Sequence, residues 1–374
     1  MGIVVSLQKM NFDTLYQKAL RQDSLNEHEG LFLYEHAPTE ELMAIANELR
    51  RQYVAHEGVS WQIDRNVNIS NVCISGCLFC NFHCKPRETD KAYTTTIDQY
   101  CEKIEELFNK GGRQLLLQGG LHPRYGLAFY ETLFQELKQR YPTLKLHALG
   151  PPEIAHIASL ERKSYREILD RLVNAGLDSL PGAGAEILID RVRKQLSPAK
   201  PNTQAWLDVM REAHRINLPT SATMMFGHIE TWQERVQHIL KIRELQAQKP
   251  DSAKGFLSFI CWPVQSHGTI LAQRYKLNPV TPVEYIRTIA ISRILLNNIP
   301  NIQVSWLTVG SDVAQICLHS GANDMGSIMI EENVVSSAGA THHMDANTIQ
   351  QCIREAGFTP WLRKQNYEPE SGCA

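Results

Sequence analysis

Four cysteines stand close together in the segment NVCISGCLFCNFHCKP, which covers residues 71–86. Cys73, Cys77 and Cys80 follow the spacing C-x-x-x-C-x-x-C, and Cys84 lies four positions further on. Thiolates at this density bind metals or exchange electrons. Three kinds of site therefore have to be compared: a structural zinc site, a redox-active dithiol and an iron–sulfur centre.

The spacing distinguishes these three kinds of site. Structural zinc takes four ligands, usually from two separated pairs, whereas these thiols share one short loop, even if His83 replaced one of them. A dithiol of Cys77 and Cys80 leaves Cys73 without a role. Three thiolates on a four-iron cubane leave one iron open to a chelating ligand, such as the amino and carboxylate groups of an amino acid. The spacing of Cys73, Cys77 and Cys80 thus favours an iron–sulfur site over zinc or a dithiol.

A second group of candidate residues lies in the turn QGGLHP, residues 118–123. Gly119 and Gly120, after Gln118, allow the backbone to approach a ligand closely. His122 is then placed to act as a base or to bind substrate. A helix-initiating turn with an exposed histidine explains the same residues equally well.

Further polar residues follow later apolar runs. Glu186 in PGAGAE can hydrogen-bond both hydroxyls of a ribose, although acidic residues also favour the first turn of a helix. Gly227 and His228 in TMMFGHIET lack neighbouring metal ligands, so they support a ligand or cap a helix. Asp324 and Glu331 can bind hydroxyls or take protons, and surface charge is the alternative interpretation.

Short apolar runs that alternate with amphipathic, helix-like stretches position these turns from residue 61 onward. The runs cover residues 61–70, 113–120, 144–150, 178–182, 219–227, 255–263, 301–306 and 322–327. Strands separated by helices indicate an α/β fold with a parallel sheet, and eight of them match a (β/α)8 barrel of the TIM type. A doubly wound open sheet has the same local pattern. The barrel is favoured because polar turns follow the strand ends, which share one mouth in a barrel.

Composition and length set the expected organisation of the chain. We expect an N-terminal helical extension over residues 1–60, the barrel over 61–358 and a peripheral tail over 359–374. The formal net charge of −2 gives no reason to expect a nucleic-acid partner. No apolar run is long enough to span a bilayer, and no signal-peptide pattern opens the chain. Nine cysteines without a regular framework indicate the reducing cytoplasm.

The cysteine loop after the first expected strand resembles that of the radical S-adenosylmethionine (SAM) superfamily, in which a reduced 4Fe–4S cluster cleaves SAM to a deoxyadenosyl radical. The resemblance implies that Cys73, Cys77 and Cys80 hold the cluster and that SAM chelates the open iron. It also implies that an aromatic residue packs near adenine, a glycine turn binds the SAM amino group and a polar residue contacts the ribose. The residues expected to contact this cofactor are Phe79, Gln118, Gly119, Gly120, Glu186, Gly227 and His228.

Longer strings are similar to one family of this superfamily, the dehypoxanthine futalosine cyclases of the futalosine route to menaquinone. These strings include DRNVNISNVCISGCLFCNF, LDSLPGAGAEIL, MMFGHIET and EENVV. The resemblance implies dehypoxanthine futalosine as substrate, a ribose radical that adds to the benzoate ring, and an electron donor such as flavodoxin or ferredoxin. Asp324 and Glu331 are then expected to bind substrate, and His122 to take the released proton.

Two alternatives stay open at this point. Aminofutalosine synthases and deazaflavin synthases share the barrel, and QGGLHP occurs in more than one of these relatives. A non-catalytic zinc or iron–sulfur protein also explains the thiols. The loop departs from the family pattern CxFCAFYR at Asn81, His83 and Cys84, and Arg87 lies close enough in sequence to replace the lost arginine.

Overall fold

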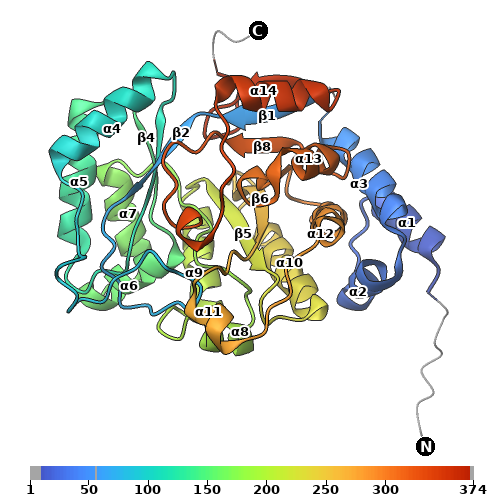
Figure 1. Ribbon diagram of the computed structural model, residues 1–374, viewed down its shortest axis with the longest axis horizontal. Helices are drawn as coiled ribbons and strands as arrows, with labels where there is room; N and C mark the ends of the chain where they lie inside the picture. Colours follow the sequence, from blue (N-terminus) through green and yellow to red (C-terminus); the bar gives the residue numbers. More distant parts are fainter. Residues whose placement is uncertain (1–9, 55–56, 371–374) are drawn as a thin grey trace, which may run out of the picture.

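The computed structural model describes residues 10–54 and 57–370. The first part of the expected N-terminal helical extension, residues 1–9, lies outside these ranges. Its centre is a barrel of parallel strands with helices around it (Figure 1). The strands are β1 (Gly58–Gln62), β2 (Asp64–Asn68), β3 (Gln114–Gln118), β4 (Lys145–Ala148), β5 (Thr220–Phe226), β6 (Phe256–Pro263), β7 (Asn301–Gln303), β8 (Asp324–Ser327) and β9 (Thr359–Leu362).

Two sheets and three isolated bridges close the barrel. One sheet has the order β5-β6-β7-β8-β1-β9 and the other the order β2-β3-β4. Bridges from His147 to Ser179 and from Leu180 to Thr220 join β4 to β5, and a bridge from Arg65 to Ile330 joins β2 to the segment after β8. The expected (β/α)8 barrel is confirmed, and the open sheet is excluded.

Two expected strands differ from the prediction. The run 61–70 forms two strands that meet at Ile63, because its first half pairs with β8 and its second half with β3. This change of partner is how one chain segment closes the ring. The run 178–182 makes only isolated bridges, since Pro181 has no N–H to donate to a neighbouring strand.

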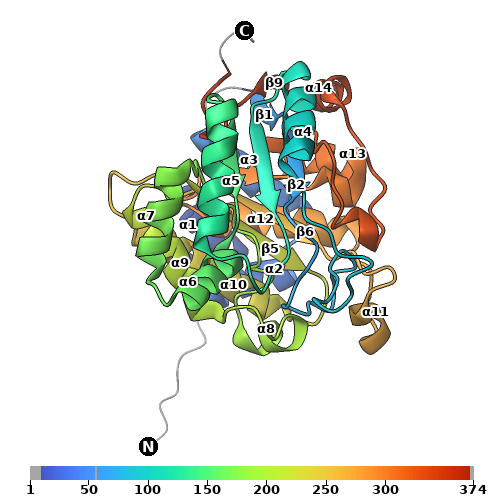
Figure 2. The same ribbon diagram turned by 90° about the vertical axis from the view of Figure 1, so that its left-hand side faces the viewer.

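Helices cover the outside of the barrel, and Figure 2 shows α4 and α5 on either side of the strand β3. The helices are α1 (Phe12–Leu20), α2 (Glu27–His36), α3 (Thr39–Tyr53), α4 (Ile97–Asn109), α5 (Leu127–Arg140), α6 (Pro151–Glu161), α7 (Tyr165–Ala175), α8 (Asp190–Leu196), α9 (Thr203–Arg215), α10 (Trp232–Ala247), α11 (Ile270–Arg274), α12 (Pro282–Leu295), α13 (Trp306–Leu318) and α14 (Ala346–Glu355). The sequence did not predict α6 or α11. The two prolines that begin α6 suit the first helical turn, which needs no backbone donor there. No helix in the described ranges has the length and apolar character to cross a membrane.

The N-terminal helices pack against α10 and α12 beside the barrel (Figure 1). Arg287 on α12 donates to the carbonyl oxygens of Tyr34 and Ala37, at 2.5 and 2.7 Å. Arg50 on α3 is buried and donates to the carbonyls of Ala322 and Gly58, both at 3.0 Å. Buried guanidinium groups thus join the helical extension to the barrel.

We expected the residues from Thr359 onward to lie at the periphery, and this expectation is wrong. Strand β9 pairs with β1 along its whole length. Arg363, which follows it, is buried at the base of the barrel, where its Nε donates to Asp324 at 2.5 Å and its guanidinium to Gln62 at 2.8 Å. Burial lowers the pKa of Arg363, but the carboxylate of Asp324 outweighs burial and raises it.

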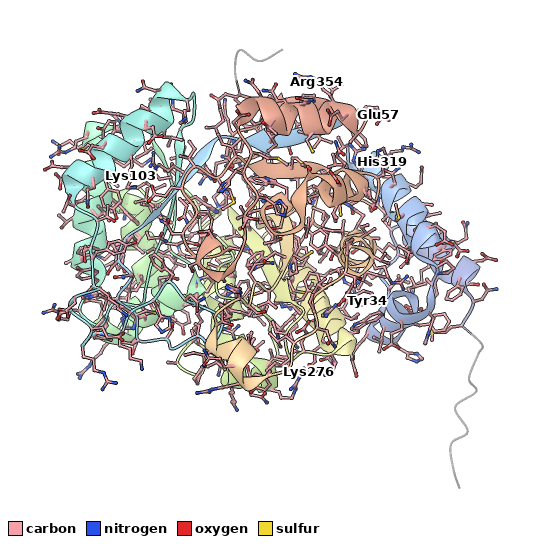
Figure 3. The ribbon with its side chains drawn as sticks, in the orientation of Figure 1. Tyr34, Glu57, Lys103, Lys276, His319 and Arg354 are labelled. Atoms are coloured by element: carbon pink, nitrogen blue, oxygen red, sulfur yellow. The ribbon has the colours of Figure 1, made fainter. Side chains whose placement is uncertain are left out.

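We predict that Arg363→Leu lowers the free energy of unfolding by about 3–5 kcal/mol, because it leaves the buried carboxylate of Asp324 without a counter-ion. The measurement is the denaturant midpoint. Arg354→Leu, on the exposed face of α14 (Figure 3), is the matched control and should change stability by less than about 0.5 kcal/mol. Equal midpoints for the two variants would contradict the role of this ion pair.

Candidate active site

The cysteine loop is held against the end of the neighbouring strand. Pairing of β2 with β3 sets the register, and beyond it Gly120 N donates to Ser70 O at 2.8 Å and Ile74 N to Leu121 O at 3.1 Å. A Cβ on Gly120 would lie 2.2 Å from the carbonyl oxygen of Val72. Gly120 therefore allows the loop, and not only a ligand, to approach the backbone.

Three of the four thiols of the loop face one cavity. Cys73, Cys77 and Cys80 line a cavity of about 380 Å³ at the mouth of the barrel, a size usual for small-molecule sites, and Cys84 is not among its lining residues. The hydroxyl of Ser75 lies 2.9 Å from the sulfur of Cys73 and 3.3 Å from that of Cys77. This arrangement agrees with the expected division into three site thiols and one other.

The donor set fits a 4Fe–4S cluster better than a single metal ion. Three thiols on one cavity wall can bind three irons of a cubane and leave the fourth iron open. All described cysteines are free thiols. The backbone N–H of Leu121 donates to Cys73 Sγ at 3.2 Å, and hydrogen bonds to sulfur are one means of tuning such clusters. Cys73, Cys77 and Cys80 can hold the cluster, with Cys84 behind them.

Cys84 has a structural environment of its own. It is buried, its backbone pairs with Cys73 and Asn71, and its thiol points to the amide oxygen of Asn71 at 3.5 Å. The other departures from the family pattern also have contacts. Asn81 donates to the carbonyl oxygens of His267 and Ser337, at 2.9 and 3.1 Å, and thereby joins the cysteine loop to two distant segments.

The cavity walls are mainly apolar and carry few charged groups. Its aromatic residues are Phe79, Phe82, Trp262 and Trp306, and its acidic residues are Glu153, Glu186 and Glu332. Among the described residues, Lys200 is the one Lys or Arg in its lining. The ammonium group of Lys200 lies 5.5 Å from the ring centroid of Phe79. Gln118, Gly119 and Gly120 line the same cavity. The structure thus brings most of the expected cofactor-contacting residues together.

Glu186 is buried and paired at the cavity wall. Its carboxylate lies 2.8 Å from Lys200 Nζ and 3.5 Å from the guanidinium of Arg193. Burial raises its pKa, but Lys200 and Arg193 outweigh burial and lower it, so the group is ionised at neutral pH. Glu186 is in place to accept hydrogen bonds from a ligand hydroxyl.

His122 does not reach the cavity. It is buried outside it, stacks on Tyr125 with ring centroids 3.6 Å apart, and accepts a hydrogen bond from the backbone of Arg124 at its Nδ1. Burial lowers its pKa. The expectation that His122 takes a substrate proton is therefore wrong for this geometry.

Gly227 and His228 also lie outside the main cavity. Gly227 lines a separate hollow beside it, with a positive φ of 85°. His228 is enclosed, with Nδ1 2.7 Å from Glu230, and Glu230 also pairs with Arg235 at 2.7 Å. This buried network secures the start of α10, so capping is the better interpretation of His228.

The two expected substrate carboxylates are placed elsewhere. Asp324 begins β8 and pairs with Arg363 at the base of the barrel, the end opposite the mouth. Glu331 pairs with Arg65 at 2.9 Å and with Lys103 on α4, which Figure 3 labels. Its neighbour Glu332 does line the cavity, where its carboxylate accepts the backbone N–H groups of residues 334–336.

Sequence reasoning missed Glu153 and Lys200. Glu153 stands in GPPE, directly after the expected strand over residues 144–150, but it was not singled out as a site residue. Lys200 lies beyond α8 and reaches the cavity only through the fold, so no local pattern could have identified it. Both line the cavity, where Glu153 is buried and Lys200 is partly buried.

Comparison with known proteins agrees with the geometry. Residues 67–242 match the model of the radical SAM superfamily, and residues 253–373 match the CofH/MqnC C-terminal region. The crystal structure of methylornithine synthase (PylB) superposes with a TM-score of 0.69 and 17% identity, covering 92% of this chain and 97% of that one, which shows a shared fold.

Two relatives are similar over nearly the whole chain. A cyclic dehypoxanthine futalosine synthase of Streptomyces coelicolor is 40% identical, with 96% of this chain and 89% of the relative covered. A 5-amino-6-(D-ribitylamino)uracil–L-tyrosine 4-hydroxyphenyl transferase of Methanosarcina mazei is 36% identical, with 95% and 93% covered. The chain belongs to the radical SAM superfamily and, within it, to the CofH/MqnC family. It is an enzyme that uses a 4Fe–4S cluster and SAM.

We predict that Cys73→Ala, Cys77→Ala and Cys80→Ala each abolish binding of the about four irons of a 4Fe–4S cluster after anaerobic reconstitution. Cys84→Ala is the matched control from the same loop, and it should retain iron and the brown colour. Iron analysis and the visible spectrum measure both results. Loss of iron in Cys84→Ala would show that the fourth thiol is a ligand.

Proposed function

We propose that this enzyme cyclises dehypoxanthine futalosine by joining the ribose of the substrate to its own benzoate ring. The observation that carries the proposal is the similarity of 96% of the chain to a cyclic dehypoxanthine futalosine synthase at 40% identity. The mainly apolar cavity that the three thiols line supports it, because one substrate has to fold its two reacting parts together there.

When bound, the cluster and SAM supply the radical that removes a hydrogen atom from the ribose. The cavity residues have other tasks. Cys73, Cys77 and Cys80 hold the cluster, Phe79 and the turn from Gln118 to Gly120 flank SAM, and Glu186 accepts a ribose hydroxyl. The apolar walls exclude water and reductants from the substrate radical.

A transfer of the hydroxyphenyl group of tyrosine to a ribitylaminouracil is the second candidate function. It is favoured by the 36% identity to the Methanosarcina mazei transferase over most of the chain. Both reactions need the same cofactors, so only the substrate distinguishes them.

We predict that the reconstituted enzyme, given dehypoxanthine futalosine, SAM and dithionite under anaerobic conditions, forms 5′-deoxyadenosine and a product two hydrogen atoms lighter than the substrate. Mass spectrometry measures both compounds. The same incubation with tyrosine and 5-amino-6-(D-ribitylamino)uracil, or with an enolpyruvyl benzoate, should yield no coupled product. Turnover of either set in place of cyclisation would overturn the proposed function.

We further propose that a flavodoxin or ferredoxin delivers the electron through the outer face of the cysteine loop. Between two buried cysteines, Ile74 and Gly76 reach the solvent. The segment that follows the loop carries exposed basic side chains on residues 85, 87 and 91, exposed acidic ones on residues 88 and 90, and an exposed Tyr93. An acidic carrier protein would find an apolar centre and cations near the cluster.

We predict that the triple variant Lys85→Glu, Arg87→Glu and Lys91→Glu loses at least about tenfold in turnover with reduced flavodoxin or ferredoxin at low salt, because like charges oppose docking. Turnover with dithionite should change less than twofold. Arg354→Glu, on α14 at the other end of the molecule (Figure 3), is the control. Equal losses with carrier and dithionite would indicate a damaged loop and contradict the docking surface.

A further inference from the structure

Glu153 is a buried carboxyl group with one uncommitted oxygen. It lies in the first turn of α6, directly after β4, with 8% of its surface exposed. Among the described residues, its Oε2 has no hydrogen-bond partner, although the side chain lines the main cavity. A buried carboxylate oxygen without a partner lowers the stability of the fold, so the position of Glu153 is not explained by stability.

The local structure makes room for this carboxylate. Gly150 precedes the two prolines of α6, and a Cβ at Gly150 would lie 3.2 Å from Glu153 Oε2 and 2.9 Å from the Cβ of Ala183. Close packing against Gly150 thus leaves the side chain of Glu153 room at the cavity wall.

Three of the other groups in this cavity that can take a proton are committed to contacts, and a fourth, His83, lies on the cysteine loop. Glu186 is paired with Lys200, and Glu332 accepts backbone N–H groups. His147 contacts the hydroxyl of Ser179 at 2.5 Å, and burial lowers its pKa to about 3. His83 lies on the cysteine loop itself, with Nδ1 2.8 Å from the carbonyl oxygen of Cys80.

The charges around Glu153 set its ionisation near neutral pH. Burial raises its pKa to about 7; its own backbone N–H and Lys200 oppose this effect, and Glu186 adds to it. Tyr130, from α5, also faces the group, since Glu153 contributes to the raised pKa of that phenol. A general base is most effective when its pKa lies close to the working pH.

We propose that Glu153 Oε2 accepts the proton that the benzoate ring loses after ring closure. This role rests on the proposed cyclisation. The C–H bond at the attacked ring carbon breaks, its electron pair stays in the ring, and the proton forms an O–H bond on Glu153. The one surplus electron of the ring would pass to an oxidised iron–sulfur centre. That centre would thereby regain the one electron that it gave at the start of the turnover. No other oxidant is consumed.

The test uses Glu153→Gln, which keeps the size of the side chain but removes its basicity. Cleavage of SAM to 5′-deoxyadenosine in the first turnover should stay within about threefold of wild type, whereas cyclised product should fall by at least about 100-fold. Wild-type product formation should rise with pH through about 7, and the variant should lose this dependence. Glu153→Asp should recover part of the rate, and Glu355→Gln on the exposed α14 is the control.

A second measurement does not depend on turnover. Infrared difference spectra of wild type minus Glu153→Gln should show a protonated carboxyl band that disappears as the pH rises through about 7. Absence of this band between pH 5 and 9 would overturn the assignment, whatever the substrate proves to be.

Three kinetic outcomes would also count against it. Unchanged product formation in Glu153→Gln would overturn the role as base. A parallel fall of SAM binding, SAM cleavage and product would show that Glu153 holds SAM. A wild-type enzyme that forms no cyclised product would overturn the proposed function itself, and with it the substrate proton assigned to Glu153.

Discussion

The contact between the Gly119–Gly120 turn and the cysteine loop is the constraint on which the site depends. A side chain on Gly120 would collide with Val72 O and with the Cβ of Cys73, 2.2 and 2.8 Å away. Because the turn ends β3 and the loop follows β2, the loop takes its position from two paired strands of the barrel. Thiols carried by a long loop thereby gain the rigidity of a sheet, which a cluster-binding site requires.

Next to this loop, the cavity contains charged groups with fixed partners and one carboxyl group whose protonation can change. Glu186 and Lys200 neutralise each other at 2.8 Å, and Glu332 is bound by backbone donors. Such fixed charges and dipoles need no reorganisation during a reaction. Glu153 differs, because burial without a partner leaves its protonation sensitive to the substrate and to pH. A closed-shell product requires the loss of one proton, and the cavity therefore needs one group of this kind.

The sequence predicted what short-range patterns determine. The strand–helix alternation identified the barrel, and the spacing of Cys73, Cys77 and Cys80 identified three thiols that share a cavity. Prediction from the sequence failed for residues whose position depends on the direction of a strand or on a partner far away in the chain. Asp324 was expected at the mouth because it stands in the segment that closes the eighth expected unit, but it begins β8, and the beginning of a barrel strand lies at the base. Lys200 reaches the cavity from beyond α8, which no periodicity reveals.

The two ends of the barrel differ in how their buried carboxyl groups are paired. The barrel interior joins the two ends, since polar and apolar residues, His147, Ser221, Gln303 and Ser327 with Leu116, Ile260 and Met329, line both the mouth cavity and a smaller hollow at the base. At the base, Arg363 from the C-terminal segment compensates the buried carboxylate. At the mouth, Glu153 Oε2 has no such partner within the part of the chain that the structure describes. Active sites sit at the mouth of such barrels, and stability is the role of the base. The C-terminal segment beyond β9 is therefore part of the enzyme's working structure, because the stability it adds at the base offsets the unpaired acid that chemistry requires at the mouth.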